Sequence, residues 1–276
     1  MSLKHKLASK VVLLTQKVLL KETQMKEQVN KVFNQAQKTF SCTEKSFEKK
    51  LQKLIRLMNK TTAKDLNLNE SIMDNEFWEQ PNKAPVTYIS LYEDDLITMG
   101  VFVLKDGMKL PLHDHPEMHG LIKVLTGKIK VKSFSIEEDP EFLYCKPPPI
   151  VLTAQKQPDI LADSTSDVCV LRPKSKNIHE IESVDGPAAF FDILSPPYET
   201  PMRDTLRRCN YFEITAKVHR DSYKLTEIEP PVWFWNDCIK YLGPAIKFEH
   251  DFSVFQRVLS QFRNVWKIFS GRCQSS

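Results

Sequence analysis

Three histidines in the middle of the sequence have the spacing of metal ligands. His113 and His115 lie two residues apart after Gly107, and His179 follows 64 residues beyond His115. Because the side chains of a strand alternate, we expect His113 and His115, at the end of a strand, to point to the same face and share one metal. His179, from a later strand, would complete a set of three ligands that leaves three coordination positions open.

An open site made only of imidazoles suits an oxygenase. Asp114 should face away from the two histidines that flank it. Without a protein carboxylate, Fe(II) keeps its full 2+ charge, which favours an anionic thiolate and lowers the pKa of the thiol, while dioxygen takes another open position. The same histidines would also hold zinc or nickel, so an isomerase or a simple ligand-binding protein is the alternative.

The remaining histidines and cysteines give no comparable pattern. His119 is either a hydrogen-bond partner of the ligands or an ordinary loop residue, and His5, His219 and His250 have no supporting context. The six cysteines lie far apart without a CxxC pair, which excludes a zinc ribbon and a dense disulfide framework. A reducing compartment fits this usage best.

The elements that must position these residues are mainly strands. Apolar residues at helical spacing predict helices over 6–38 and 44–59, the second with a capping box of Ser41 and Glu44, and a closing helix over 248–270. From Val86 onward, short β-rich runs separated by turns predict an antiparallel sandwich or barrel. The predicted strands are Val86–Leu91, Ile97–Leu104, Gly120–Leu125, Lys128–Phe134, Val168–Leu171, Ile178–Val184, Ala188–Leu194 and Asn210–Ile214.

The chain divides into a basic helical segment (1–66), a β domain (67–248) and a helical tail (249–276). The formal net charge is +4, yet residues 1–60 alone carry +10. Such an arm is either a solvated helix face or a docking element, so a non-catalytic interaction protein is a further alternative. No apolar run spans a bilayer and no aromatic stacking platform accompanies the basic charge, so we expect neither a membrane nor a nucleic acid as partner.

One short pattern resembles the first cupin motif. Gly107 is followed after five residues by His113-x-His115 and later by Gly127. Gly120, or His119 on the shorter spacing, stands where cupins commonly have a ligating glutamate. The resemblance implies a mainly β cupin fold, a double-stranded β-helix or jelly-roll barrel, here with N-terminal α-helices and a C-terminal helix.

Longer strings resemble the cysteamine (2-aminoethanethiol) dioxygenase and plant cysteine oxidase family. The similarity runs from about residue 45 to Phe248 and is carried by the segments Pro111–Gly120, Lys123–Gly127, Asn177–His179, Gly186–Tyr198, Pro230–Trp235 and Tyr241–Pro244. This family consists of cupin thiol dioxygenases. The missing glutamate agrees with the resemblance, because these enzymes use three histidines.

The resemblance implies an enzyme with Fe(II) on His113, His115 and His179. Its substrates would be dioxygen and either a small aminothiol, with cysteamine converted to hypotaurine, or a peptide whose N-terminal cysteine becomes the sulfinic acid. The peptide activity would make the protein an oxygen sensor that feeds the N-degron pathway. We expect a cytoplasmic monomer, although the basic N-terminus leaves a mitochondrial presequence open.

The same resemblance nominates four further site residues. Asp192 and Tyr198 would line the pocket, and Asp192 suits the substrate ammonium because a carboxylate on a barrel strand is costly unless it is paired; a cap of the following loop is the alternative. Cys209 and Tyr211 sit two apart on a predicted strand and share a face. In the family this pair can form a thioether crosslink, while an ordinary buried cysteine beside a tyrosine is equally compatible.

Overall fold

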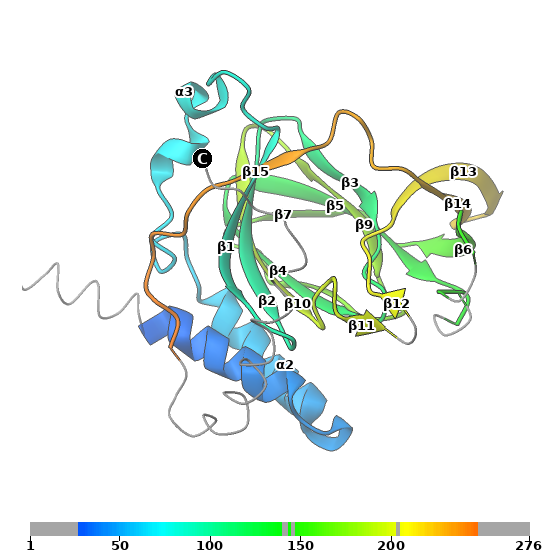
Figure 1. Ribbon diagram of the computed structural model, residues 1–276, viewed down its shortest axis with the longest axis horizontal. Helices are drawn as coiled ribbons and strands as arrows, with labels where there is room; N and C mark the ends of the chain where they lie inside the picture. Colours follow the sequence, from blue (N-terminus) through cyan, green and yellow to red (C-terminus); the bar gives the residue numbers. More distant parts are fainter. Residues whose placement is uncertain (1–26, 140–142, 145–146, 203–204, 248–276) are drawn as a thin grey trace, which may run out of the picture.

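Two β-sheets face each other, and helices cover the outer side of one of them (Figure 1). The computed structural model describes residues 27–139, 143–144, 147–202 and 205–247. Within them the architecture is the expected mainly β double-stranded β-helix of cupins. The predicted closing helix over 248–270 lies outside the described residues, and so do residues 6–26 of the first predicted helix.

The first sheet carries the helices on its outer face. Its order is β15-β1-β2-β10-β4-β8, and all neighbours are antiparallel except β15 and β1. The strands are β1 (Val86–Glu93), β2 (Thr98–Leu104), β4 (His119–Thr126), β8 (Cys169–Leu171), β10 (Ala188–Ser195) and β15 (Asn236–Cys238).

The second sheet has the order β6-β14-β13-β3-β9-β5-β7, and β5 also pairs with β6. That extra pairing turns six of the strands into a ring with a core of its own, which includes Phe134, Leu152 and Leu225. The strands are β3 (Lys109–His113), β5 (Lys128–Ile136), β6 (Val151–Lys156), β7 (Ile160–Asp163), β9 (Ile178–Ser183), β13 (Tyr211–His219) and β14 (Ser222–Ile228); β11 (Pro201–Met202) and β12 (Thr205–Leu206) form a separate small ribbon.

Helices shield the outer face of the first sheet. Residues 27–40 and α2 (Glu44–Asn59) run together beneath it, and η1 (Glu70–Met73) and α3 (Asn75–Trp78) follow (Figure 1). The apolar residues at helical spacing within residues 27–36 are buried, and they share one core with the outward side chains of the sheet. That core includes Val32, Phe33, Leu51, Leu54, Val101, Leu121 and Phe191.

The bounds predicted for α2 are confirmed, but the predicted capping box is wrong. Thr43 is the N-cap residue, and its side chain makes no capping hydrogen bond. Ser41 still belongs to the end of the preceding helix, where its hydroxyl donates to the Gln37 carbonyl at 2.6 Å. Its side chain is therefore already engaged and does not serve the start of α2.

All eight strands predicted by their ranges exist, and so does β3, the strand at whose end His113 was expected. Pro111 lies in the centre of β3, although proline cannot donate to a strand ladder. In the structure the pairing of β3 with β9 is irregular between Leu110 and His113, so Pro111 sits where no regular ladder bond is required. Strands β6 and β14 were not predicted, because their segments show no clear alternation of apolar and polar residues.

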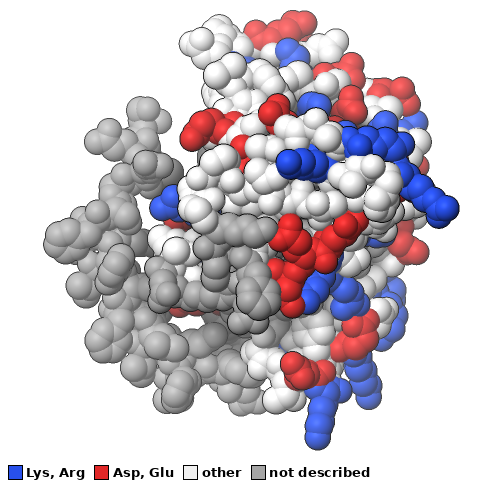
Figure 2. Space-filling view, turned by 90° about the vertical axis from the view of Figure 1, so that its right-hand side faces the viewer, with Lys and Arg blue, Asp and Glu red and all other residues white. Residues whose placement is uncertain are grey.

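No helix among the described residues has the length and apolar composition needed to cross a bilayer. On the face shown in Figure 2, acidic and basic side chains lie interspersed. This face therefore lacks the single-sign field that would steer a polyanion towards it.

We predict that two glycines of the same backbone conformation differ in their tolerance of a side chain. Gly107 and Gly127 have φ values of +68° and +70°, but a Cβ at Gly107 would meet nothing within 4 Å, whereas one at Gly127 would lie 2.2 Å from the Pro187 carbonyl oxygen. Gly107→Ala should cost only the left-handed strain, about 1–2 kcal/mol. Gly127→Ala should cost about 1–3 kcal/mol more because backbone must move. Urea unfolding of both variants tests this, and equal losses would contradict it.

Candidate metal centre

The three predicted ligands converge inside the barrel. Their nearest ring nitrogens all lie within 4.8 Å of one another, and the residues are between 3% and 8% exposed. The strand register creates this cluster, because His113 at the end of β3 stands directly opposite His179 on antiparallel β9. His115 lies two residues beyond β3 and returns to the same centre. The three histidines named from the sequence therefore lie close enough together to share one metal ion.

Hydrogen bonds leave one nitrogen of His113 and one of His115 free for a cation. The His113 Nδ1 lies 2.7 Å from the Pro111 carbonyl oxygen, which can only accept, so Nδ1 carries the proton. Tyr198 donates its single hydroxyl proton to the Asp114 carbonyl, so it must accept from the His115 Nδ1 at 2.8 Å. Both rings therefore present an unprotonated Nε2.

The third ring faces the second at short range. The Nε2 atoms of His115 and His179 are 3.0 Å apart. Two lone pairs at that distance repel, so a proton or a cation must lie between them. Since no carboxylate joins the cluster among the described residues, its donor set is three imidazoles, as predicted.

Burial keeps the imidazoles neutral. Desolvation lowers the pKa of His113 to about 4. The pKa values of His115 and His179 lie well below 6.5 for the same reason, with additional repulsion from the neighbouring rings. At neutral pH the three rings therefore offer lone pairs without first losing a proton.

Asn177 ties the two halves of the cluster together. It is completely buried, and its side chain donates to the His115 carbonyl at 2.7 Å while accepting from the His115 N–H at 3.3 Å. Because Asn177 stands two residues before His179, it fixes the loop of one ligand to the strand of another. Asn177 belongs to the segment Asn177–His179 that carries part of the family resemblance, but the sequence alone gives it no role; an Asn two residues before a candidate ligand was the available signal.

Asp114 and His119 take no part in the cluster. Asp114 faces away, as predicted, and accepts hydrogen bonds from the Asn210 backbone and side chain at 2.9 and 3.0 Å. His119 points to the outer side of the sheet, where its ring packs 4.8 Å from that of Phe47. It is therefore not a hydrogen-bond partner of the three ligands.

Tyr198, Cys209 and Tyr211 lie together beside the ligands. Tyr211 stands opposite His113 in the pairing of β13 with β3. The Cys209 thiol lies within hydrogen-bonding reach of both tyrosine hydroxyls, and burial raises its pKa to about 12. The prediction that Cys209 and Tyr211 share a strand is wrong, because β13 begins at Tyr211. The segment before β13 nevertheless brings the two side chains into hydrogen-bonding contact.

Asp192 is a buried carboxylate without a complete set of partners. It lies on β10 opposite Gly100 and Ile122 and is 8% exposed. Its Oδ1 has no hydrogen-bond partner among the described residues. Burial raises the pKa of Asp192 to about 7. A hydrogen-bond donor on a bound ligand would satisfy this oxygen.

Comparison with known proteins decides the family. The sequence model of the PCO_ADO family matches residues 57–246. The chain belongs to the PCO_ADO family. Human 2-aminoethanethiol dioxygenase is 32% identical over 230 residues, which cover 72% of this chain and 82% of the human protein. Arabidopsis thaliana plant cysteine oxidase 1 is 27% identical over 191 residues, 67% of this chain and 62% of that protein.

Solved cupins overlap with this PCO_ADO chain only in part. A cupin superfamily protein from Desulfitobacterium hafniense aligns with 14% identity and a TM-score of 0.29, covering 43% of this chain and 84% of the other. A Klebsiella pneumoniae protein with a double-stranded β-helix domain aligns with 12% identity and a TM-score of 0.30, covering 46% and 91%. The fold assignment therefore rests on the strand order and the family membership.

We predict that Tyr198 supports metal binding through His115. Tyr198→Phe removes the acceptor of the His115 Nδ1 proton and should weaken divalent metal binding about 10-fold or more, as losses of such outer hydrogen bonds do. Chelator competition measures the affinity. Tyr223→Phe is the control, because Tyr223 packs on Phe134 in the second core. Unchanged affinity in Tyr198→Phe would contradict the role of the hydrogen bond.

Proposed function

We propose that this chain is an Fe(II)-dependent dioxygenase that oxidises the thiol of an aminothiol, or of a peptide's N-terminal cysteine, to the sulfinic acid. The observation that carries the proposal is a buried cluster of three neutral imidazoles in a chain of the PCO_ADO family. In the net reaction both oxygen atoms of O2 are added to sulfur. The sulfur loses four electrons and dioxygen accepts them.

The residues present fit such a metal. His113, His115 and His179 would hold it, since their free nitrogens face one another and no carboxylate joins them among the described residues. Fe(II) bound there would supply the redox chemistry with dioxygen that a thiol lacks on its own. The hydrogen bonds of His113 and His115 keep both rings in the tautomer that binds a cation.

The chain's own side chains would bind and orient the substrate. We assign Asp192 to the substrate ammonium, because its buried carboxylate otherwise has an unsatisfied oxygen. Tyr198 would act through His115 rather than on the substrate. For Cys209 and Tyr211, their proximity supports the thioether crosslink as part of the proposal. A carbon–sulfur bond would replace the S–H and a ring C–H bond, with dioxygen as the oxidant, and an intact mass two hydrogens lighter than the sequence requires would be its signature.

The proposal extends to substrates and setting. By analogy with relatives named for 2-aminoethanethiol and for cysteine, the thiol would be cysteamine, giving hypotaurine, or an N-terminal cysteine. Oxidation of an N-terminal cysteine would make the lifetime of that peptide depend on dioxygen, which is a form of oxygen sensing. We propose that the protein does this in the cytoplasm as a monomer.

The central test is oxygen uptake by the iron-loaded protein with cysteamine and with a Cys-initiated peptide. We expect a product heavier by two oxygen atoms, and His179→Ala should lose at least about 100-fold in turnover, because a ligand matters more than the hydrogen bonds around it. His219→Ala is the control, since His219 is exposed at the end of β13. Iron binding without oxygen uptake would instead favour an isomerase or a ligand-binding protein.

We also predict a pH signature of Asp192. The carboxylate binds an ammonium only when ionised, and its raised pKa of about 7 means that ionisation develops as pH rises through 7. Tyr88 and Tyr198 face it and remain neutral, because burial raises their pKa values. Asp192→Asn should therefore lower kcat/KM for cysteamine about 10-fold or more at pH 8 and progressively less towards pH 6.

A thiol without an ammonium group provides the control for this prediction. 2-Mercaptoethanol should be oxidised by the wild type and by Asp192→Asn with similar kcat/KM at every pH. Thiol ionisation is common to both proteins, so it cancels in the ratio of wild type to variant. A ratio for cysteamine that does not change with pH would count against Asp192 as the ammonium partner.

A further inference from the structure

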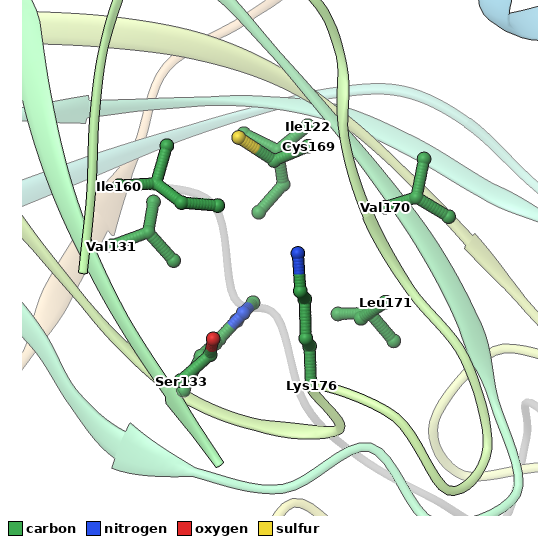
Figure 3. A pocket seen from close by; sticks show the side chains of 9 residues that line it. Ile122, Val131, Ser133, Ile160, Cys169, Val170, Leu171 and Lys176 are labelled. Carbon is green, nitrogen blue, oxygen red and sulfur yellow. The ribbon is translucent and has the colours of Figure 1, made fainter. Parts of the chain in front are cut away.

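A small pocket adjoins the candidate metal centre on the side of His179. It lies between strands β4 and β8 of one sheet and strands β5 and β7 of the other (Figure 3). Its walls are mostly apolar and include Ile122, Val131, Ile160 and Leu171. The cavity measures about 20 Å³, enough for about one water molecule. It therefore suits a small end group rather than a bulky side chain.

Lys176 extends its ammonium into this pocket. Figure 3 shows the side chain reaching into the space lined by Ile122 and Cys169. The turn before β9 sets its position: Lys176 has a left-handed φ of 57°, and its N–H donates to the Ser135 hydroxyl at 3.0 Å. The next residue, Asn177, is locked onto His115. The base of the lysine is thus held by the same turn that organises the ligands.

The Lys176 ammonium has no ion-pair partner within the described part of the chain. Other lysines nearby do: Lys174 lies 3.1 Å from Asp139, and Lys109 lies 2.8 Å from Glu180. The pocket lining contains no carboxylate. The Cys169 thiol also lines the pocket. Burial raises its pKa, so the thiol stays neutral and does not balance the positive charge of Lys176.

Ser133 adds a second unsatisfied group in the same pocket. It stands opposite His179 in the pairing of β5 with β9 and is 1% exposed. Its hydroxyl has no hydrogen-bond partner among the described residues. A buried hydroxyl without a partner costs free energy unless a ligand or a water completes it.

We propose that Lys176 and Ser133 bind a carboxylate of the thiol substrate. A carboxylate is small and accepts hydrogen bonds from both an ammonium and a hydroxyl. It also supplies the negative charge that would balance the Lys176 ammonium. The inference rests on the proposed function and deepens it, because it selects thiols that carry a carboxylate over cysteamine. The carboxylate is either that of free cysteine or that of an acidic second residue in a Cys-initiated peptide.

The geometry is compatible with a bipolar substrate. Asp192 on β10 faces the barrel interior opposite Ile122, and Ile122 also lines the pocket of Lys176. A cysteine whose sulfur lies at the histidines could then direct its ammonium towards Asp192 and its carboxylate towards Lys176. Cysteamine, which has no carboxylate, would leave Lys176 and Ser133 unsatisfied.

Steady-state kinetics of the iron-loaded full chain test the proposal. The thiols are L-cysteine, cysteamine, and the amidated dipeptides Cys-Asp and Cys-Gly. We expect wild type to prefer a carboxylate-bearing thiol over its carboxylate-free counterpart about 10-fold. Lys176→Met should abolish that preference, Ser133→Ala should reduce it about threefold, and Lys176→Glu should reverse it. Lys174→Met is the matched control, and its preference should equal that of wild type.

The two pairs of thiols identify the source of the carboxylate. A preference confined to L-cysteine assigns the α-carboxylate, and one confined to Cys-Asp assigns an acidic second residue. Equal losses for all four thiols in Lys176→Met would overturn the proposal, because a merely structural lysine would act in that way. Wild type that shows no preference in either pair would overturn it as well.

Anaerobic calorimetry separates this proposal from the proposed function. Titration of both pairs of thiols onto the iron-loaded protein measures affinity without turnover. Tighter binding of the carboxylate-bearing member of either pair that depends on Lys176 supports the subsite even if no oxygen is consumed, in which case only the dioxygenase function fails. Oxygen uptake with cysteamine and equal affinities within both pairs would retain the function and overturn the subsite.

Discussion

The pairing register of β3 and β9 is the constraint on which the candidate site depends. It sets His113 opposite His179, and the pairing of β5 with β9 sets Ser133 opposite the same histidine. A slip of one residue would turn His179 to the other face of the sheet. Asn177 protects this register, because its buried side chain joins the strand of His179 to the loop of His115.

The barrel interior holds polar groups that folding alone does not explain. Most of its lining is apolar and forms one core with Val131 and Phe190. Around the histidines, however, Asp192 and Ser133 keep buried oxygens without partners among the described residues. Each costs stability, so their presence around the cluster indicates that ligand binding, rather than packing, accounts for them. The extensive core beneath the helices offsets such costs.

Sequence patterns predicted what depends on local spacing. The histidine pair, α2 and eight strands follow from periodicities of two and of 3.6 residues, and the third ligand followed from its motif. The predicted capping box was wrong because the Ser41 hydroxyl already donates to the Gln37 carbonyl at the end of the preceding helix. Lys176 and Ser133 could not have been identified, since only the register of β5 with β9 and the turn before β9 bring them to one pocket.

The site divides its tasks between the two sheets. The second sheet supplies His113 and His179, so a metal centre is largely a property of that sheet, whereas Asp192 comes from β10 of the first. A substrate held by both must bridge the barrel, and its affinity depends on how the sheets are spaced. The described helices pack on the outer face of the first sheet. Disturbance of that packing should therefore reach Asp192 and substrate recognition before it reaches the ligands on β3 and β9.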